Sequence, residues 1–250
     1  MSRAHLEALP RWVTTGIGGS PSTALSWETE VPWLAELVSA GETVSAARTP
    51  AAWPTFLEEV ARRRPAFAKV QLPGPLTCGR DLGDRARRYI EALRALQVTP
   101  LVFVDEPLLV RGGGERALLA LRDCIAEAGG ISGLHCCGQA DWPAVLALDF
   151  DVVSLDARLS LASLLRAPEA WRRFVDSGAW LALGIIPTDG GAPYRVRALC
   201  DDARALLGSF ERALLTPACG LGLFDVPRAT RVVRELTEAA AYLRGAASTR

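Results

Sequence analysis

Short apolar runs alternate with longer amphipathic stretches along most of this chain of 250 residues. Such alternation is typical of βα units that build a parallel sheet. Eight runs are predicted as strands, at residues 13–17, 43–45, 67–72, 101–104, 131–134, 151–155, 180–186 and 214–216. Between most of them, apolar positions recur every three or four residues, as a helix requires.

The number of strands decides the predicted architecture. Leu118, Leu121 and Ile125 form one apolar helical stripe, and Pro227 suits the first turn of a last helix. Eight strands alternating with helices predict an α/β fold, a single (β/α)8 TIM barrel, with residues 1–250 as one barrel domain. A doubly wound open sheet is the alternative, but it would not gather so many strand ends at one site.

Composition narrows the classes of function. Half of the residues are hydrophobic, enough to bury a large core without a disulfide framework. The 28 basic and 28 acidic residues balance, so no overall field favours nucleic acid or an anionic membrane as a partner. No run approaches the roughly 20 apolar residues of a membrane helix, and the opening residues do not resemble a secretory signal. We therefore expect a cytoplasmic protein whose cysteines are thiols.

Residues that can bind a metal ion lie near the ends of predicted strands. They are His135, Cys137, Asp156 and Cys219. Positions 135 and 137 of an extended strand point to the same side, so both can face one ion while Cys136 faces away. In a parallel barrel the strand ends open onto one face, where residues distant in sequence converge. Imidazole, thiolate and carboxylate groups together favour zinc.

Each of these residues has a structural alternative. A single histidine at a strand end, such as His135, is more often a hydrogen-bonded core residue. Cys219 could be a small buried hydrophobe, and Asp156 could orient His135 instead of binding the metal. Cys124 and Cys200 lie in helical patterns and are predicted to be inert.

Two further segments suggest a substrate site. Asp105 and Glu106 point to opposite faces if their strand continues, so one carboxylate can reach the barrel mouth while the other braces a loop or helix. The first could grip a substrate ammonium or accept a proton, although an acidic turn before Pro107 is the alternative. Segment 16–21 lacks a dinucleotide fingerprint and is better interpreted as a turn that offers backbone amides and the Ser20 hydroxyl to a carboxylate.

Six short motifs occur along the chain in a characteristic order. They are TGIGGSP at 15–21, QLPGPLT at 71–77, VDEP at 104–107, LHCCG at 134–138, VVSLD at 152–156 and TPACGL at 216–221. Taken together, they resemble the catalytic C-terminal barrel of cobalamin-independent methionine synthase and its short single-barrel relatives. These proteins belong to the uroporphyrinogen decarboxylase/methionine synthase-like superfamily.

The resemblance implies a set of zinc ligands. His135, Cys137 and Cys219 match the ligands of the family. Asp156 stands where the methionine synthases have a ligating glutamate, so the shorter side chain distinguishes this chain from them.

The resemblance also implies how an amino acid is held. Asp105 matches the carboxylate that contacts the amino group of homocysteine. Ile17, Gly19 and Ser20 belong to the turn that matches the amino-acid-binding segment, with Gly19 in place of the family's serine and Ser20 displaced by one.

Two departures from the family bear on the methyl donor. Segment 184–190 lacks the histidine that methionine synthases carry after the corresponding strand, and Thr77 is not followed by their tryptophan. Short relatives are thought to use other donors, including methylated corrinoid proteins. We therefore expect a methylcorrinoid protein as the donor partner rather than methyltetrahydrofolate.

These inferences predict a zinc-dependent methyltransferase that acts on a small thiol, homocysteine being methylated to methionine. The enzymatic alternative is another zinc-dependent thiol alkyltransferase or lyase. The non-enzymatic alternative is a metal- or ligand-binding barrel that has lost turnover, as the missing histidine suggests.

Overall fold

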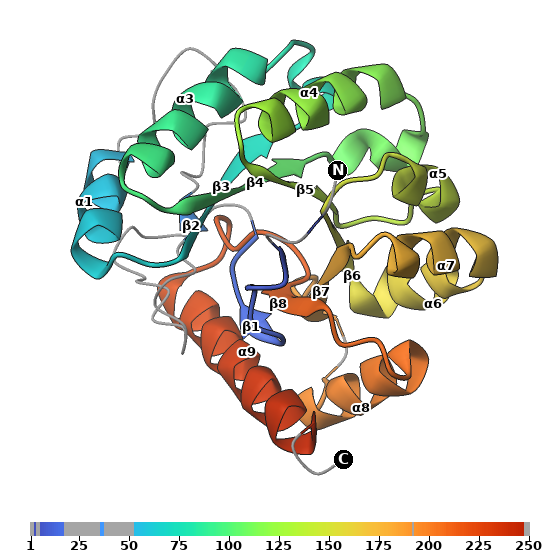
Figure 1. Cartoon of the computed structure of the whole chain (residues 1–250). Helices are drawn as coiled ribbons and strands as arrows, with labels where there is room; N and C mark the ends of the chain where they lie inside the picture. Colours follow the sequence, from blue (N-terminus) through green and yellow to red (C-terminus); the bar gives the residue numbers. More distant parts are fainter. Residues whose placement is uncertain (1–2, 4–5, 18–35, 38–52, 192, 248–250) are drawn as a thin grey trace.

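Parallel strands form one continuous sheet at the centre of the molecule, with helices on its outside (Figure 1). The computed structural model describes residues 3, 6–17, 36–37, 53–191 and 193–247. The strands are β1 (Val13–Thr14), β2 (Glu36–Leu37), β3 (Phe67–Pro73), β4 (Thr99–Asp105), β5 (Ile131–Cys136), β6 (Val152–Asp156), β7 (Trp180–Ile186) and β8 (Ala213–Pro217). Their order is β1-β8-β7-β6-β5-β4-β3-β2. From β2 to β8 each strand lies beside its neighbours in sequence, and β1 lies beside β8, which confirms the predicted (β/α)8 barrel.

Helices connect the strands and cover the sheet. They are α1 (Trp53–Arg63), α2 (Pro75–Cys78), α3 (Gly83–Ala95), α4 (Glu115–Glu127), α5 (Trp142–Ala147), α6 (Ala162–Leu165), α7 (Pro168–Asp176), α8 (Val196–Leu207) and α9 (Val226–Ala247). A 3-10 helix, η3 (Pro107–Arg111), follows β4, and a π-helix, η4 (Ala157–Leu161), follows β6. The predicted stripe of Leu118, Leu121 and Ile125 is buried on α4.

The predicted strands differ from the observed ones mainly at the start of the chain. β1 is shorter than the predicted run 13–17, because the backbone makes its last bond to β8 at Thr15, whose N–H donates to Leu215 O at 2.8 Å, and then leaves the sheet. The predicted strand 43–45 lies outside the described residues, and the strand that pairs with β3 is Glu36–Leu37. The prediction for residues 180–186 is confirmed as β7.

The barrel interior is divided into an apolar part and a polar part. One buried cluster holds strand residues such as Phe67, Leu101 and Trp180, together with Leu6 and Leu9 from the N-terminal segment. Because alternate strand positions face inward, later residues on the same strands also face the interior. Several of these later residues, or residues just beyond a strand, are polar, and they are Lys69, Gln71, Asp105, His135, Ser154, Thr15 and Thr216. The polar end of the interior is therefore the end toward the carboxyl termini of the strands.

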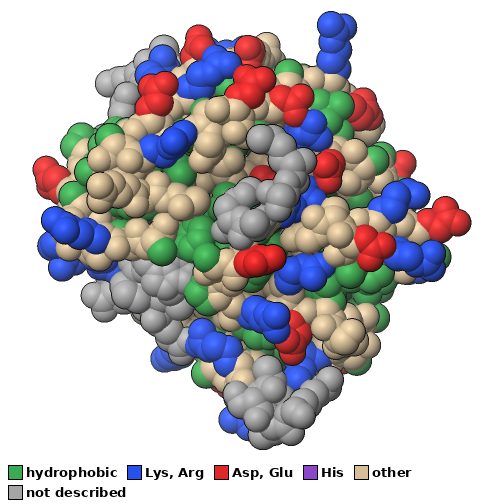
Figure 2. Space-filling model, in the orientation of Figure 1, with side chains coloured by type: hydrophobic (Ala, Val, Ile, Leu, Met, Phe, Trp, Pro, Cys, Tyr) green, Lys and Arg blue, Asp and Glu red, His purple; other side chains and the backbone are tan. Residues whose placement is uncertain are grey.

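Neither positive nor negative charge dominates the face of the molecule drawn in Figure 2. Figure 2 shows basic and acidic side chains interspersed over that face, consistent with the balanced composition. Within the described part of the chain, no helix has the length and apolar character that crossing a membrane requires.

Candidate functional site

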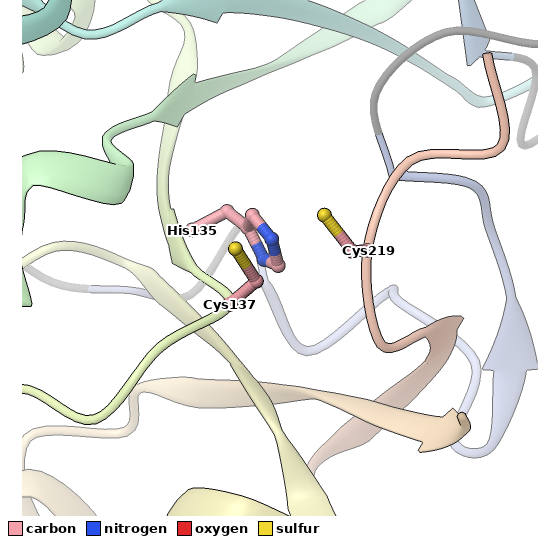
Figure 3. Close-up of side chains that lie close together, drawn as sticks. All are labelled: His135, Cys137 and Cys219. Atoms are coloured by element: carbon pink, nitrogen blue, oxygen red, sulfur yellow. The ribbon is translucent and has the colours of Figure 1, made fainter. Parts of the chain in front are cut away.

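Three of the predicted metal ligands come together. The ligand atoms of His135, Cys137 and Cys219 all lie within 4.8 Å of one another. Figure 3 shows the three side chains directed toward a common space, His135 and Cys137 from the β5 side and Cys219 from the segment after β8. Residues more than eighty positions apart in the sequence are thus brought to the carboxyl end of the barrel, as predicted.

A close approach between backbones sets the position of Cys219. The Ala218 N–H donates to Ile186 O at 2.8 Å, which anchors the segment after β8 against the end of β7. A Cβ atom added to Gly184 would lie 2.7 Å from the Ala218 Cα. Only glycine fits there, so Gly184 allows the segment that carries Cys219 to pack against β7.

The imidazole of His135 is oriented by its neighbour on the next strand. His135 is fully buried, with 0% of its surface exposed, and its Nδ1 lies 2.9 Å from Ser154 Oγ. His135 and Ser154 are register partners between β5 and β6. Among the described residues, the buried Nε2 atom of His135 has no hydrogen-bond partner. A buried imidazole nitrogen without a partner, beside two thiols, fits a metal ligand.

The geometry and chemistry of the cluster fit zinc. With zinc bonds of ~2.3 Å to sulfur and ~2.0 Å to nitrogen, tetrahedral ligand atoms lie roughly 3.5–3.8 Å apart. The three ligand atoms lie within 4.8 Å of one another, so small side-chain movements would bring them to that spacing. One imidazole and two thiolates are also a donor set that zinc favours in catalytic sites with an open position.

The two thiols of the cluster interact with each other. This contact lowers the pKa of Cys137, whereas burial opposes the shift. The same contact raises the pKa of Cys219, and the nearby imidazole of His135 acts in the opposite direction. The pair therefore releases its first proton more easily from Cys137, and thiolates are the form in which cysteines bind a metal.

Asp156 does not belong to the cluster of three. Its Oδ1 accepts hydrogen bonds from the N–H groups of Arg158 at 2.9 Å and Leu159 at 3.1 Å, so it caps the start of η4. Burial raises the pKa of Asp156. In this arrangement Ser154, and not Asp156, orients His135. Direct binding of a metal by Asp156 stays a prediction that would need a change in this cap.

The paired carboxylates Asp105 and Glu106 divide their roles as predicted. Glu106 is fully buried at 0% exposure, and it accepts hydrogen bonds from the backbone of Leu76 at 2.7 Å and of Thr77 at 3.1 Å. It therefore satisfies the first N–H groups of α2, which have no partner within the helix. A Cβ added to Gly74 would meet its Oε2 at 2.1 Å, so glycine is required beside it.

Asp105 is the carboxylate that faces the barrel interior. It is partly exposed, is the register partner of His135, and its Oδ2 accepts a hydrogen bond from Gln71 Nε2 at 3.2 Å. The predicted ammonium site therefore adjoins the predicted metal site across two neighbouring strands.

The predicted turn for the amino acid is only partly described. Ile17 is buried and packs in the inner apolar cluster, so only its backbone could contact a substrate. Gly19 and Ser20 lie outside the described residues. Their role in binding stays a prediction.

Cys124, Cys136 and Cys200 are not members of the cluster. Cys136 packs in the outer core between sheet and helices, as expected for a residue that faces away from Cys137. Cys124 donates to Gly83 O at 3.3 Å. Burial raises the pKa of Cys200 to about 12. Cys124 and Cys136 donate hydrogen bonds to backbone carbonyl groups, and the raised pKa of Cys200 keeps its thiol protonated. These features are consistent with structural roles.

Ser154 is a site residue that the sequence reasoning missed. Its signal was the position two residues before Asp156, which places it on the same face of the strand.

We expect Ser154→Ala to weaken zinc binding by about 10- to 100-fold, because the imidazole loses the partner that fixes its orientation. Competition against a zinc chelator measures this change. The control is Ser132→Ala, which replaces a buried serine on the neighbouring strand β5 and should retain the wild-type affinity for zinc. Equal zinc affinities in the wild type and both variants would contradict the role of Ser154.

Comparisons with known proteins identify the fold. No family model and no curated protein matches the chain. A methyltransferase from Methanosarcina mazei matches with a TM-score of 0.60 at 12% identity, over 94% of this chain and 96% of that one. The GH113 β-mannanase AaManA from Alicyclobacillus acidocaldarius matches with a TM-score of 0.53 at 11% identity, over 94% and 99%. At these identities both likenesses show the (β/α)8 barrel alone.

A third structural match is weaker. A proposed vitamin B12-independent methionine synthase from Listeria monocytogenes gives a TM-score of 0.43 at 17% identity, over 69% of this chain and 64% of that one. This likeness is too weak to support an inference about chemistry. The residues of the site must therefore carry any functional conclusion.

Proposed function

We propose that this protein is a zinc-dependent methyltransferase that methylates a small thiol, homocysteine, to give methionine. The observation that carries the proposal is the convergence of His135, Cys137 and Cys219, with a buried imidazole Nε2 that has no partner among the described residues. The motif resemblance to cobalamin-independent methionine synthases supports the choice of reaction. The fold alone does not indicate which reaction is catalysed, because structures with a similar fold include both a methyltransferase and a β-mannanase.

The site residues divide the work of binding and orientation. A zinc ion held by the cluster would supply Lewis acidity, which keeps a small thiol in its nucleophilic thiolate form near neutral pH. Ser154 keeps the imidazole of His135 in a fixed orientation. Asp105 holds the ammonium of the acceptor on the strand next to His135. In the transfer, the acceptor sulfur forms a bond to the methyl carbon, and the bond between that carbon and the donor breaks with its electrons leaving on the donor.

A protein-bound methylcorrinoid is the donor we propose. Apolar side chains that are strongly exposed follow the carboxyl ends of several strands, namely Val110 after β4, Leu159 after β6, Tyr194 after β7, and Leu223 and Val226 after β8. In a (β/α)8 barrel the loops after the strands lie on one face, where exposed apolar side chains are available to contact a docked protein. A donor docked there would meet the acceptor at the barrel mouth and would position the methyl group for transfer.

The direct test is methyl transfer to homocysteine, with methionine measured by mass spectrometry. We expect zinc-loaded protein to form methionine from a methylcorrinoid donor, with methylcobalamin as the probe, and much more slowly from methyltetrahydrofolate. Removal of the metal should reduce the rate to background, and added zinc should restore it. Undiminished thiol methylation by metal-free protein would contradict the proposal. Failure to form methionine from any donor would favour the non-catalytic barrel instead.

A further inference from the structure

A lysine lies within the polar part of the barrel interior. Lys69 on β3 is fully buried, with 0% of its surface exposed. It alternates with Phe67, which packs in the inner apolar cluster, so its side chain faces the interior. Its Nζ lies 4.8 Å from the centre of the Phe103 ring, a favourable cation–π contact. Burying an ammonium is costly unless it forms hydrogen bonds, so the bonds of Lys69 indicate what it holds in place.

Two of these bonds link opposite parts of the predicted acceptor site. Lys69 Nζ donates to Gly16 O at 2.8 Å and to Gln71 Oε1 at 3.0 Å. Gly16 immediately precedes Ile17, the first residue of the predicted amino-acid-binding turn. Lys69 therefore ties the backbone at the end of β1 to the inner face of β3.

The bond to Gln71 fixes the direction of its amide. An ammonium group can only donate hydrogen bonds, so the group of Gln71 that faces Lys69 must be its oxygen. The amide nitrogen then points to the other side, where it donates to Asp105 Oδ2 at 3.2 Å. A reversed amide would place two donors against each other at Lys69 and two acceptors against each other at Asp105. Lys69 thus determines that Asp105 receives a hydrogen bond.

One oxygen of Asp105 stays available for a ligand. Oδ2 is used by Gln71, whereas Oδ1 accepts no hydrogen bond from any described residue. A carboxylate held through one oxygen presents the other in a defined direction, which reduces the ordering cost of binding an ammonium.

We infer that Lys69 and Gln71 are positioning residues that make this barrel selective for thiols carrying an α-amino group. Lys69 orients Gln71, Gln71 orients Asp105, and Asp105 receives the ammonium. This inference rests on the proposed function, since it takes the acceptor to be an amino-acid thiol. It adds two residues that act on the acceptor without touching it and that lie outside the zinc cluster.

A purely structural role for Lys69 predicts a different result. If the lysine only stabilised the barrel, its loss would weaken the binding of all ligands alike or lower the melting temperature alone. A positioning role instead changes the discrimination between ligands that have an amino group and ligands that lack one.

Equilibrium binding separates these roles without requiring turnover. Zinc-loaded wild-type protein is titrated with L-methionine and with 4-(methylthio)butanoate, which has the same chain but no amino group. The same titrations are made with Lys69→Met, Gln71→Met, the double variant, and Asp105→Asn as the reference. Gln71→Met keeps the size of the side chain and provides a second variant if Lys69→Met does not fold.

The expected result is a loss of selectivity in all the variants. Removing a hydrogen bond to a charged group should weaken methionine binding by about tenfold or more, with less than about a twofold change for the amino-free analogue. The double variant should be no worse than the weaker single variant, because both residues act through one chain of bonds. Selectivity lost in Asp105→Asn but retained in Lys69→Met and Gln71→Met would overturn the positioning role alone. Wild-type protein that does not prefer methionine to the analogue would overturn the amino-acid acceptor as well.

Discussion

Replacement of Cys137 or Cys219 by serine is expected to reduce thiol methylation by about 1000-fold or more. Each thiol contributes one of the three ligand atoms that the described residues bring to the cluster, and a serine hydroxyl is a poor substitute for a thiolate at neutral pH. The expected loss corresponds to the several kcal/mol that a bound metal contributes to such a reaction. Initial rates of methionine formation from homocysteine measure it.

Cys136→Ser is the matched control for these variants. Cys136 immediately precedes Cys137, but it packs in the outer core and its Sγ lies 3.7 Å from Gly138 O, its hydrogen-bond acceptor. We expect this variant to lower the stability slightly and to keep at least about half of the wild-type rate. If Cys136→Ser were as inactive as Cys137→Ser, the loss would reflect disturbance of β5 and not of a metal site.

Glu106→Gln is expected to lower the free energy of unfolding by about 2–4 kcal/mol, because it replaces a buried acceptor of several hydrogen bonds with a group that is half donor. In addition to its bonds to α2, Glu106 accepts a hydrogen bond from Leu108 N at 3.3 Å, so it joins α2 to η3. The amide nitrogen of glutamine would face backbone N–H groups. Thermal unfolding should show a drop of roughly 5–15 °C in the melting temperature.

Asp105→Asn provides the comparison for Glu106→Gln at the neighbouring position. Asp105 is partly exposed and accepts one side-chain hydrogen bond, so its replacement should change the stability by less than about 1 kcal/mol while weakening methionine binding. Equal destabilisation by both substitutions would contradict the division of roles between the two carboxylates.

The barrel was predictable because long strands leave a clear pattern. Seven residues of continuous apolar sequence mark β7, and the predicted range 180–186 is confirmed. β2, by contrast, has only the two residues Glu36–Leu37, too few for an apolar periodicity to develop. Its place in the sheet depends on pairing with β3, which is a contact distant in sequence.

The candidate site was predictable where the chemistry of a residue type is distinctive. His135 and Cys137 were identified because alternate positions of a strand share a face, and the later cysteine supplied the distant partner. Asp156 was expected beside them, but the turn into η4 uses its carboxylate as a cap. A local hydrogen bond of this kind depends on the backbone path after the strand, which the residue pattern does not reveal.

The orienting residues were not predictable from the sequence. Ser154 acquires its role only through register with His135. Lys69 is the single lysine of the chain, but its importance depends on Gln71 and Gly16, which the barrel places around it. Serine, lysine and glutamine occur at many surface positions, so their type alone indicates no site.

The most direct test of a zinc site formed by His135, Cys137 and Cys219 is the zinc content of protein purified without added metal. The measurement compares the wild type with Cys137→Ser and Cys219→Ser, after confirming that each is folded. We predict close to one zinc ion per wild-type chain and loss of most of it in both variants. A well-folded wild-type protein that binds no zinc, even after reconstitution, would contradict the proposed chemistry of the barrel.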